Sequence, residues 1–335
     1  MRKLLVCIFL IWLSDTFAQS PAKCLEDVNA GNYDVAWLAL TKKLGHNPAD
    51  IVLLYSKSLL FYQHDYQNFN LDSAQYYLQK IPADAFTTLK KSERKKLYRL
   101  GIRPFRLNEY QMKIYSDAFD STEKKKSIAQ WNHYLKVFPL SPYKNVAIQN
   151  RNTLAWNDAK NNFSYNSFKD FIDHYPDATQ IEEAKMLYEE LLYKSKTRDS
   201  TYQCYKQFMI DYPNSRFLDS AKENYERLLY ITLTAEHTEK AFATFTNDYP
   251  NSPYLGEAED SLYAFTASEN KSTSFKKFIA SYPDNKHVTD AWNQLYNLST
   301  LRFDSASIQK FIYLFPDHPL QTRIGNDLEL LHINA

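Results

Sequence analysis

Glycine is scarce in this chain, at 5 of 335 residues. A glycine-rich phosphate loop, a dinucleotide-binding fingerprint or a β-sandwich with glycine turns would each need more. Three cysteines are too few for a disulfide framework. An excess of one charge is also missing, since 40 Lys and Arg face 39 Asp and Glu. No strong overall field therefore draws the protein to nucleic acid or to anionic lipid, and we predict no nucleic-acid partner.

Aromatic residues, by contrast, are abundant: the chain has 26 Tyr, 21 Phe and 5 Trp. A chain this rich in aromatics is not disordered by composition.

The start of the chain, 1–18, has the pattern of a secretory signal peptide. Arg2 and Lys3 precede the apolar run 4–13, and the run 16–18 offers small residues before Gln19. Ten apolar residues are too few to span a bilayer, which takes about 20. The alternatives are an uncleaved anchor or a buried helix. The pattern predicts an exported chain that starts near Gln19.

A Tyr-Pro or Phe-Pro step recurs six times and defines an internal repeat. Its prolines are Pro139, Pro176, Pro213, Pro250, Pro283 and Pro316, so the successive intervals are 37, 37, 37, 33 and 33. Eight, five and one residues before each proline, 17 of the 18 positions are aromatic. This spacing places them on one stripe of a helix.

A second helix is predicted after each proline. Alanine stands eight residues later in five of the six units, at Ala147, Ala184, Ala221, Ala258 and Ala291, and Ile324 takes the sixth position. Mostly apolar residues follow at twelve and fifteen residues, again on one helical stripe. Proline ends the first helix because it lacks an amide donor and clashes with the preceding turn. We expect the alanine to allow close helix approach and the aromatics to be core rather than ligand platforms.

This pattern of aromatic-x-x-aromatic-x-x-x-Tyr-Pro-Asn/Asp, with its alanine, resembles the tetratricopeptide repeat (TPR) over roughly residues 123–333. It is similar to the units of Gram-negative envelope assembly lipoproteins and periplasmic cell-division coordinators. The resemblance implies an all-α, right-handed superhelical solenoid of antiparallel helix hairpins, in the periplasm or at the outer membrane. One departure is that the small residue usual after position twelve is absent, for example at Glu189 and Glu226.

The predicted organisation is a signal peptide at 1–18, TPR-like hairpins at 19–82, a basic helical connection at 83–122 and six repeats at 123–335. Helices are expected at Ile51 to Tyr62 and Leu71 to Ile81. Because distant repeats of a solenoid do not touch, we predict that Cys24 and Cys204 stay separate thiols.

The connection is locally basic, with eight Lys or Arg and one acid between 88 and 106. The segment Lys90–Arg106 could bind anionic lipid headgroups or an acidic protein surface, or it could be a solvated helix face.

Motifs of catalysis and metal binding are missing from the sequence. It has no His-Glu-x-x-His, Gly-x-Ser-x-Gly, phosphate loop or Cys-x-x-Cys, and its four Ser-x-x-Lys matches lack their partner motifs. We predict a protein that is not an enzyme, with no catalytic, metal or cofactor residues.

In the TPR, the first helix of each hairpin lines the concave face. Extended to this chain, that geometry implies a polar groove of Met186, Glu190, Tyr193, Glu223, Arg227, Tyr230, Asp260, Asn293 and Asn297. Such a groove suits an extended peptide or protein of the cell envelope. The first functional hypothesis is therefore a binding scaffold. The alternative is a periplasmic module for glycan or peptidoglycan fragments, which exposed aromatics would favour. An enzyme on a solenoid body would need a polar cleft that no motif predicts.

Overall fold

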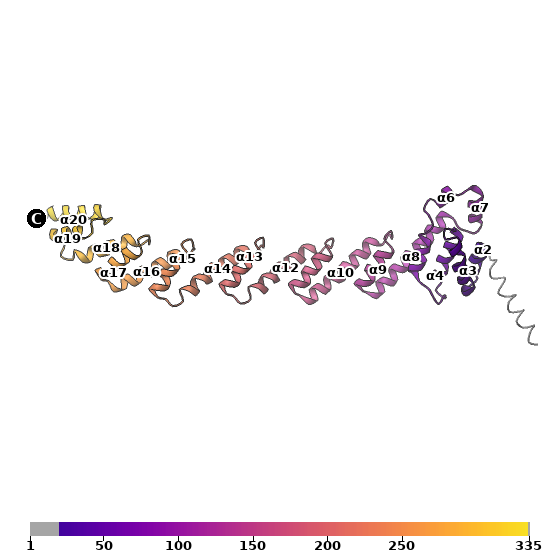
Figure 1. Ribbon diagram of the computed structural model, residues 1–335, viewed down its shortest axis with the longest axis horizontal. Helices are drawn as coiled ribbons and strands as arrows, with labels where there is room; N and C mark the ends of the chain where they lie inside the picture. Colours follow the sequence, from indigo (N-terminus) through magenta and orange to yellow (C-terminus); the bar gives the residue numbers. More distant parts are fainter. Residues whose placement is uncertain (1–19, 334–335) are drawn as a thin grey trace, which may run out of the picture. The chain divides into compact units, whose positions relative to one another are not determined.

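The computed structural model describes residues 20–333, and within that range the secondary structure is helical with no strand (Figure 1). The predicted signal peptide lies outside the described residues. The all-α prediction is confirmed, and consecutive helices pack against one another in neighbouring pairs.

The chain divides into two compact units, with the division after Lys185. The first unit contains α2 (Pro21–Asn29), α3 (Tyr33–His46), α4 (Ile51–Tyr62), α5 (Leu71–Leu78), α6 (Ala85–Thr88), α7 (Lys91–Arg99), α8 (Pro104–Lys125), α9 (Ile128–Val137), α10 (Lys144–Asn162) and α11 (Tyr165–His174). The division falls within α12 (Ile181–Lys196). The second unit continues with α13 (Tyr202–Asp211), α14 (Leu218–Leu233), α15 (Glu239–Asp248), α16 (Leu255–Glu269), α17 (Ser272–Ser281), α18 (Val288–Ser299), α19 (Ser305–Leu314) and α20 (Gln321–Ile333).

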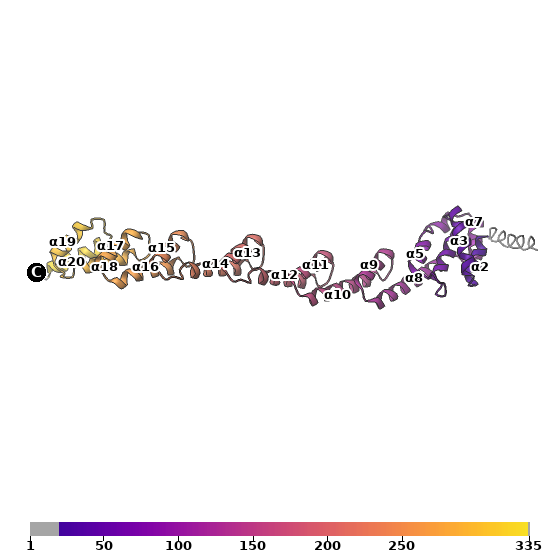
Figure 2. The ribbon, with the colours of Figure 1, turned by 60° about the horizontal axis from the view of Figure 1, so that its bottom comes forward.

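The N-terminal helices of the first unit surround a shared apolar core. Helix α4 has the predicted bounds, and it packs on α2, α3 and α5, three helices that are grouped together in Figure 2. Tyr66, in the loop before α5, is buried against the rings of Tyr33, Trp37 and Phe61. This loop is therefore held to the core by its own aromatic residue.

The predicted basic connection includes a core helix. Although α8 begins within that segment, it buries Tyr110, Ile114, Tyr115 and Phe119 and packs on both α5 and α9. The sequence did not indicate this role, because the segment was characterised by its basic residues, which precede the apolar stripe of α8.

The repeated aromatic stripe is buried as predicted at its first two positions in all six units. These twelve residues are at most 9% exposed, and they are Trp131, Tyr134, Phe168, Phe171, Tyr205, Phe208, Phe242, Phe245, Phe275, Phe278, Ile308 and Phe311. The third position, just before the proline, is half-buried in five units and buried only at Phe138. The helix has already ended at this position, so its ring lies at the edge of the core.

The alanine of each second helix is fully buried. Ala147, Ala184, Ala221, Ala258 and Ala291 are each 0% exposed, and Ile324 is 3% exposed. A larger side chain at these sites would displace the neighbouring helix.

Each hairpin also contains a left-handed residue between its long helix and the next short one. Their φ angles lie between 39° and 51°, at Lys126, Phe163, Ser200, His237, Asn270 and Phe303. In four of the six turns, the next residue caps the following helix by accepting a backbone amide hydrogen bond, at Ser164, Thr201, Thr238 and Asp304. A chain poor in glycine thus makes its recurrent turns with residues that bear a Cβ, at some cost in strain.

A second periodic feature joins successive hairpins. Rings at positions i and i+24 meet in four places: Phe119 with Tyr143, Tyr193 with Phe217, Tyr230 with Tyr254, and Tyr263 with His287. The last three pairs are stacked, with centroids 4.7–5.1 Å apart and planes within 15°. Each pair links one long helix to the start of the next, so we call these contacts the inter-repeat stacks.

Candidate partner-binding surfaces

The nine residues of the predicted groove fall into two groups in the second unit. Five of them contact the following repeat through their side chains: Tyr193, Tyr230, Asp260, Asn293 and Asn297. The other four are Met186, Glu190, Glu223 and Arg227, which lie on α12 and α14. The predicted face is therefore partly a seam between successive long helices.

The two tyrosines of the predicted groove are structural residues. Tyr193 stacks on Phe217 and meets Phe208 edge-on, and Tyr230 makes equivalent contacts with Tyr254 and Phe245. Burial raises the pKa of both hydroxyls. Substituting either ring would perturb the repeat interface as well as any binding.

The polar members of the seam form hydrogen bonds across it. Arg323 of α20 donates to the side-chain oxygens of Asn293, at 2.6 Å, and Asn297. Its guanidinium also lies over the Tyr296 ring. These groups satisfy one another between α18 and α20 and are only partly available to a partner.

An aspartate–histidine–aspartate arrangement fastens α16 to α18. The His287 ring lies 2.6 Å from Asp260 and 2.9 Å from Asp290, and Lys286 pairs with Asp260 at 2.8 Å. The hydrogen bond to Asp260, followed by that to Asp290, raises the pKa of His287. The hydrogen bonds from His287 and Lys286 lower the pKa of Asp260. Because each charge here has a partner, this cluster is better suited to joining repeats than to proton transfer.

Four predicted residues remain available on the surface. Met186 is 58% exposed although its carbonyl accepts a hydrogen bond from Arg216. Glu190 pairs with Lys194 at 2.6 Å on its own helix. Glu223 is exposed, and the exposed Arg227 donates only to Asn224, one turn away. Contacts of this kind within one helix are weak and easily exchanged for a partner's groups.

The first unit contains a second type of surface, formed by the basic helix α7 and the turn that follows it. The turn is a Schellman motif, in which Gly101 donates to the Tyr98 carbonyl and Ile102 donates to the Leu97 carbonyl. Gly101 adopts a φ of +76°, which favours glycine. Ile102 is 0% exposed and packs in one cluster with Leu97. This turn returns the chain so that Arg103 lies over the Tyr98 ring.

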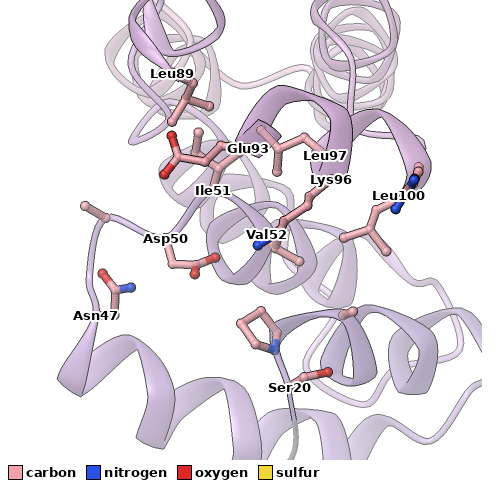
Figure 3. A pocket seen from close by; sticks show the side chains of 14 residues that line it. Ser20, Asn47, Asp50, Ile51, Val52, Leu89, Glu93, Lys96, Leu97 and Leu100 are labelled. Atoms are coloured by element: carbon pink, nitrogen blue, oxygen red, sulfur yellow. The ribbon is translucent and has the colours of Figure 1, made fainter. Parts of the chain in front are cut away.

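The two faces of α7 line different hollows. One face carries Glu93, Lys96 and Leu97, which with Arg99, Leu100 and the starts of α2 and α4 line a hollow of about 770 Å³ (Figure 3). Asp50 also borders this hollow, where it caps α4 by accepting from the Leu53 amide. The lining is mixed in charge and largely apolar around Ile51, Val52 and Leu97.

The opposite face of α7 forms a hollow with only basic and aromatic lining. About 660 Å³ in volume, it is lined by Lys91, Arg94, Lys95, Tyr98, Arg99 and Arg103, which we call the cationic cradle. Within residues 20–333, none of these five cations forms an ion pair. The sequence identified the basic segment, but only the turn at Gly101 shows that its residues line one concave surface.

Three further observations concern the whole described range. Between residues 20 and 333, no group of three His, Cys, Asp or Glu side chains is placed to hold a metal ion. Over the same residues, no helix has the length and apolar character needed to cross a bilayer. The prediction of two separate thiols is confirmed, because Cys24 and Cys204 are both free.

Comparison with known proteins leaves the chain's family open. No protein-family model matches the sequence, and no curated protein matches it either.

Proposed function

We propose that this protein is an exported, non-catalytic scaffold with a TPR-like, right-handed superhelical array that binds a protein or an extended peptide of the cell envelope. The observation that carries the proposal is the burial of the repeated aromatic stripe. A glycan-binding module would need many of these rings at the surface. Here the residues at the first two stripe positions of each repeat are buried between packed helices. The aromatic content is thus explained by stacking repeats, which leaves the polar faces of the long helices for recognition.

The exposed part of the predicted groove is the best-supported partner surface. Met186, Glu223 and Arg227 combine an apolar contact with both charges, on helices that follow one another along the second unit. An extended peptide can use such a row of alternating contacts. Tyr193 and Tyr230 belong to the inter-repeat stacks, so we assign them a structural role and not a binding role.

Site-specific photo-crosslinking tests the proposal. A photoreactive phenylalanine analogue is placed at Met186, at Glu223 or, as a control, at the exposed Lys206 of α13. We expect a discrete protein adduct from the first two sites in intact cells and none from the control site. The variant Glu223→Lys/Arg227→Glu, which keeps the net charge, should lose the adduct made from position 186. Equal crosslinking at all three sites, or none at any, would refute a partner groove on these helices.

A further inference from the structure

We propose that the cationic cradle of α7 is a docking site for the anionic phospholipid headgroups of a membrane surface. The cradle presents five cations on one concave surface of about 660 Å³, with no carboxylate in its lining. A charge-neutral protein gains no long-range attraction to anionic lipid from its net charge. Local clusters of Lys and Arg nevertheless bind such surfaces, because each basic residue near the surface adds to the attraction.

The cations of the cradle are free to interact with an external ligand. Some basic residues elsewhere in the first unit do have acidic partners, since Lys23 pairs with Asp27 and Arg106 pairs with Glu109. Glu93, the acid nearest in sequence, faces the other hollow and accepts from the backbone amide of Lys90. Of the five cradle cations, only Arg99 also lines the hollow that contains Glu93 and Asp50, and the lining of the cradle itself has no acid to offset the repulsion among its cations. A surface of phosphate groups would relieve that repulsion.

Exposed aromatic rings beside the cradle favour a membrane over an acidic protein. Tyr98 lies within the lining and is 39% exposed, with Arg103 over its ring. Phe105, two residues after Arg103, is 69% exposed. Aromatic side chains with this exposure, next to Lys and Arg, suit the boundary between headgroups and acyl chains. Their apolar parts would enter the interface while the cations bind phosphates.

The cradle is also held rigidly enough to act as one site. Leu97 and Ile102 anchor the turn in the core, and the Schellman hydrogen bonds fix the return of the chain toward Arg103. Because these anchors face away from the cradle, its exposed residues can be changed without altering the core. Acidic substitutions are also compatible with the helix starts at Lys91 and Arg103, where negative charge favours the helix.

Vesicle sedimentation with the full chain tests this inference. The vesicles contain phosphatidylcholine alone or with about one third phosphatidylglycerol. We expect binding only to the anionic vesicles, and weaker binding as salt is raised. Lys91→Glu/Lys95→Glu/Arg103→Glu should lower the partition coefficient at least about tenfold. The matched control, Lys124→Glu/Lys125→Glu/Lys126→Glu, makes the same change of charge outside the lining of the cradle, and it should bind nearly as well as the wild type.

A second variant and a soluble competitor separate the possible ligands. Phe105→Ser should mainly reduce the binding that persists at high salt, since it removes an apolar contact and no charge. Glycerol phosphate and inorganic phosphate should compete only weakly, because one phosphate engages few of the cations. If either anion binds the cradle while the vesicles do not sediment the protein, the ligand is a free phosphate and the lipid proposal fails. Equal loss of vesicle binding in the cradle and control variants would also overturn the proposal. So would binding of an acidic protein, in the absence of vesicles, that the cradle variant loses. Circular dichroism of each variant checks that the fold is kept.

Discussion

Lys57 on α4 offers a quantitative test of the first unit's core. Its side chain is 1% exposed, and its ammonium nitrogen bonds only to the Thr41 hydroxyl, at 2.7 Å, and lies 3.2 Å from the Trp37 ring centroid. Because no carboxylate of residues 20–333 pairs with it, desolvation lowers the pKa of Lys57 from 10.5 to about 7. Removing this amine should therefore change how stability depends on pH.

The sign follows from the protons bound in each state. Above pH 10.5 the amine is neutral whether the chain is folded or unfolded, so ionisation of Lys57 does not change the free energy of unfolding. As the pH falls toward 7, only the unfolded chain takes up the proton, and stability falls by about 1.4 kcal/mol per pH unit. The full shift corresponds to about 5 kcal/mol. We therefore expect a loss of about 4 kcal/mol between pH 10.5 and 7, because over most of this range the amine is neutral in the folded protein and charged only in the unfolded chain.

The variant Lys57→Met keeps the packing of the stem and removes the titration. It should be more stable than the wild type at pH 7 and gain no such advantage at pH 10. The protection of the buried Cys24 thiol from labelling, with the other cysteines replaced by serine, reports opening of this unit. Wild type and variant are compared at the same pH, so the thiol's own ionisation cancels. An identical pH dependence for both proteins would refute the argument, because it would mean that Lys57 remains charged in the folded core.

Three further predictions concern the repeats. Ala221→Trp should destabilise the second unit by about 1–3 kcal/mol, because the site is 0% exposed; an unchanged urea midpoint would contradict the assigned packing. Gln180 occupies the i+24 position relative to Trp156 and has a buried oxygen with no hydrogen-bond partner. Gln180→Phe should add a stack and remove that oxygen, raising stability by about 1–2 kcal/mol, and a lower denaturation midpoint would count against it. His287→Gln should lose up to about 1 kcal/mol at pH 5.5 and much less at pH 8.5. The raised pKa of His287 gives stability that is complete below its unfolded pKa and disappears as the pH rises through its folded pKa; thermal unfolding at both pH values checks the difference.

The helical hairpins were predictable because their signals are local. Each Tyr-Pro or Phe-Pro step ends one helix by steric exclusion, and the rings eight and five residues earlier share one helical face. Phe208 and Ala221 illustrate this, since both are at most 1% exposed as their positions require. The helices of the N-terminal core were harder to predict from the sequence. They lack a repeated spacing, and α8 carries its core residues after a strongly basic stretch.

The residues of the predicted groove, which lie at fixed distances after each proline, do not occupy equivalent positions in all units. Counting forward from Pro250 or Pro283 assumes that all units are equal in length, whereas these two prolines precede intervals of 33 rather than 37. In the shorter units, a residue at the same distance after the proline therefore lies about one helical turn closer to the next repeat. This explains why the side chains of Asp260 and Asn293 contact the following repeat, whereas those of Met186 and Glu223 are exposed on the surface.

Counting backward from the following proline reveals the signal that the forward count misses. Twenty residues before each of the six prolines stands an aromatic residue, at Phe119, Trp156, Tyr193, Tyr230, Tyr263 and Tyr296. Four of these form the inter-repeat stacks with the residue at i+24. The four residues missing from the shorter units are therefore lost before this ring, within the long helix. Removing about one turn there keeps the side chains on their original faces and leaves the next hairpin in register. Each repeat thus keeps its contact with the next hairpin, while the length of its long helix before that contact varies by about one turn.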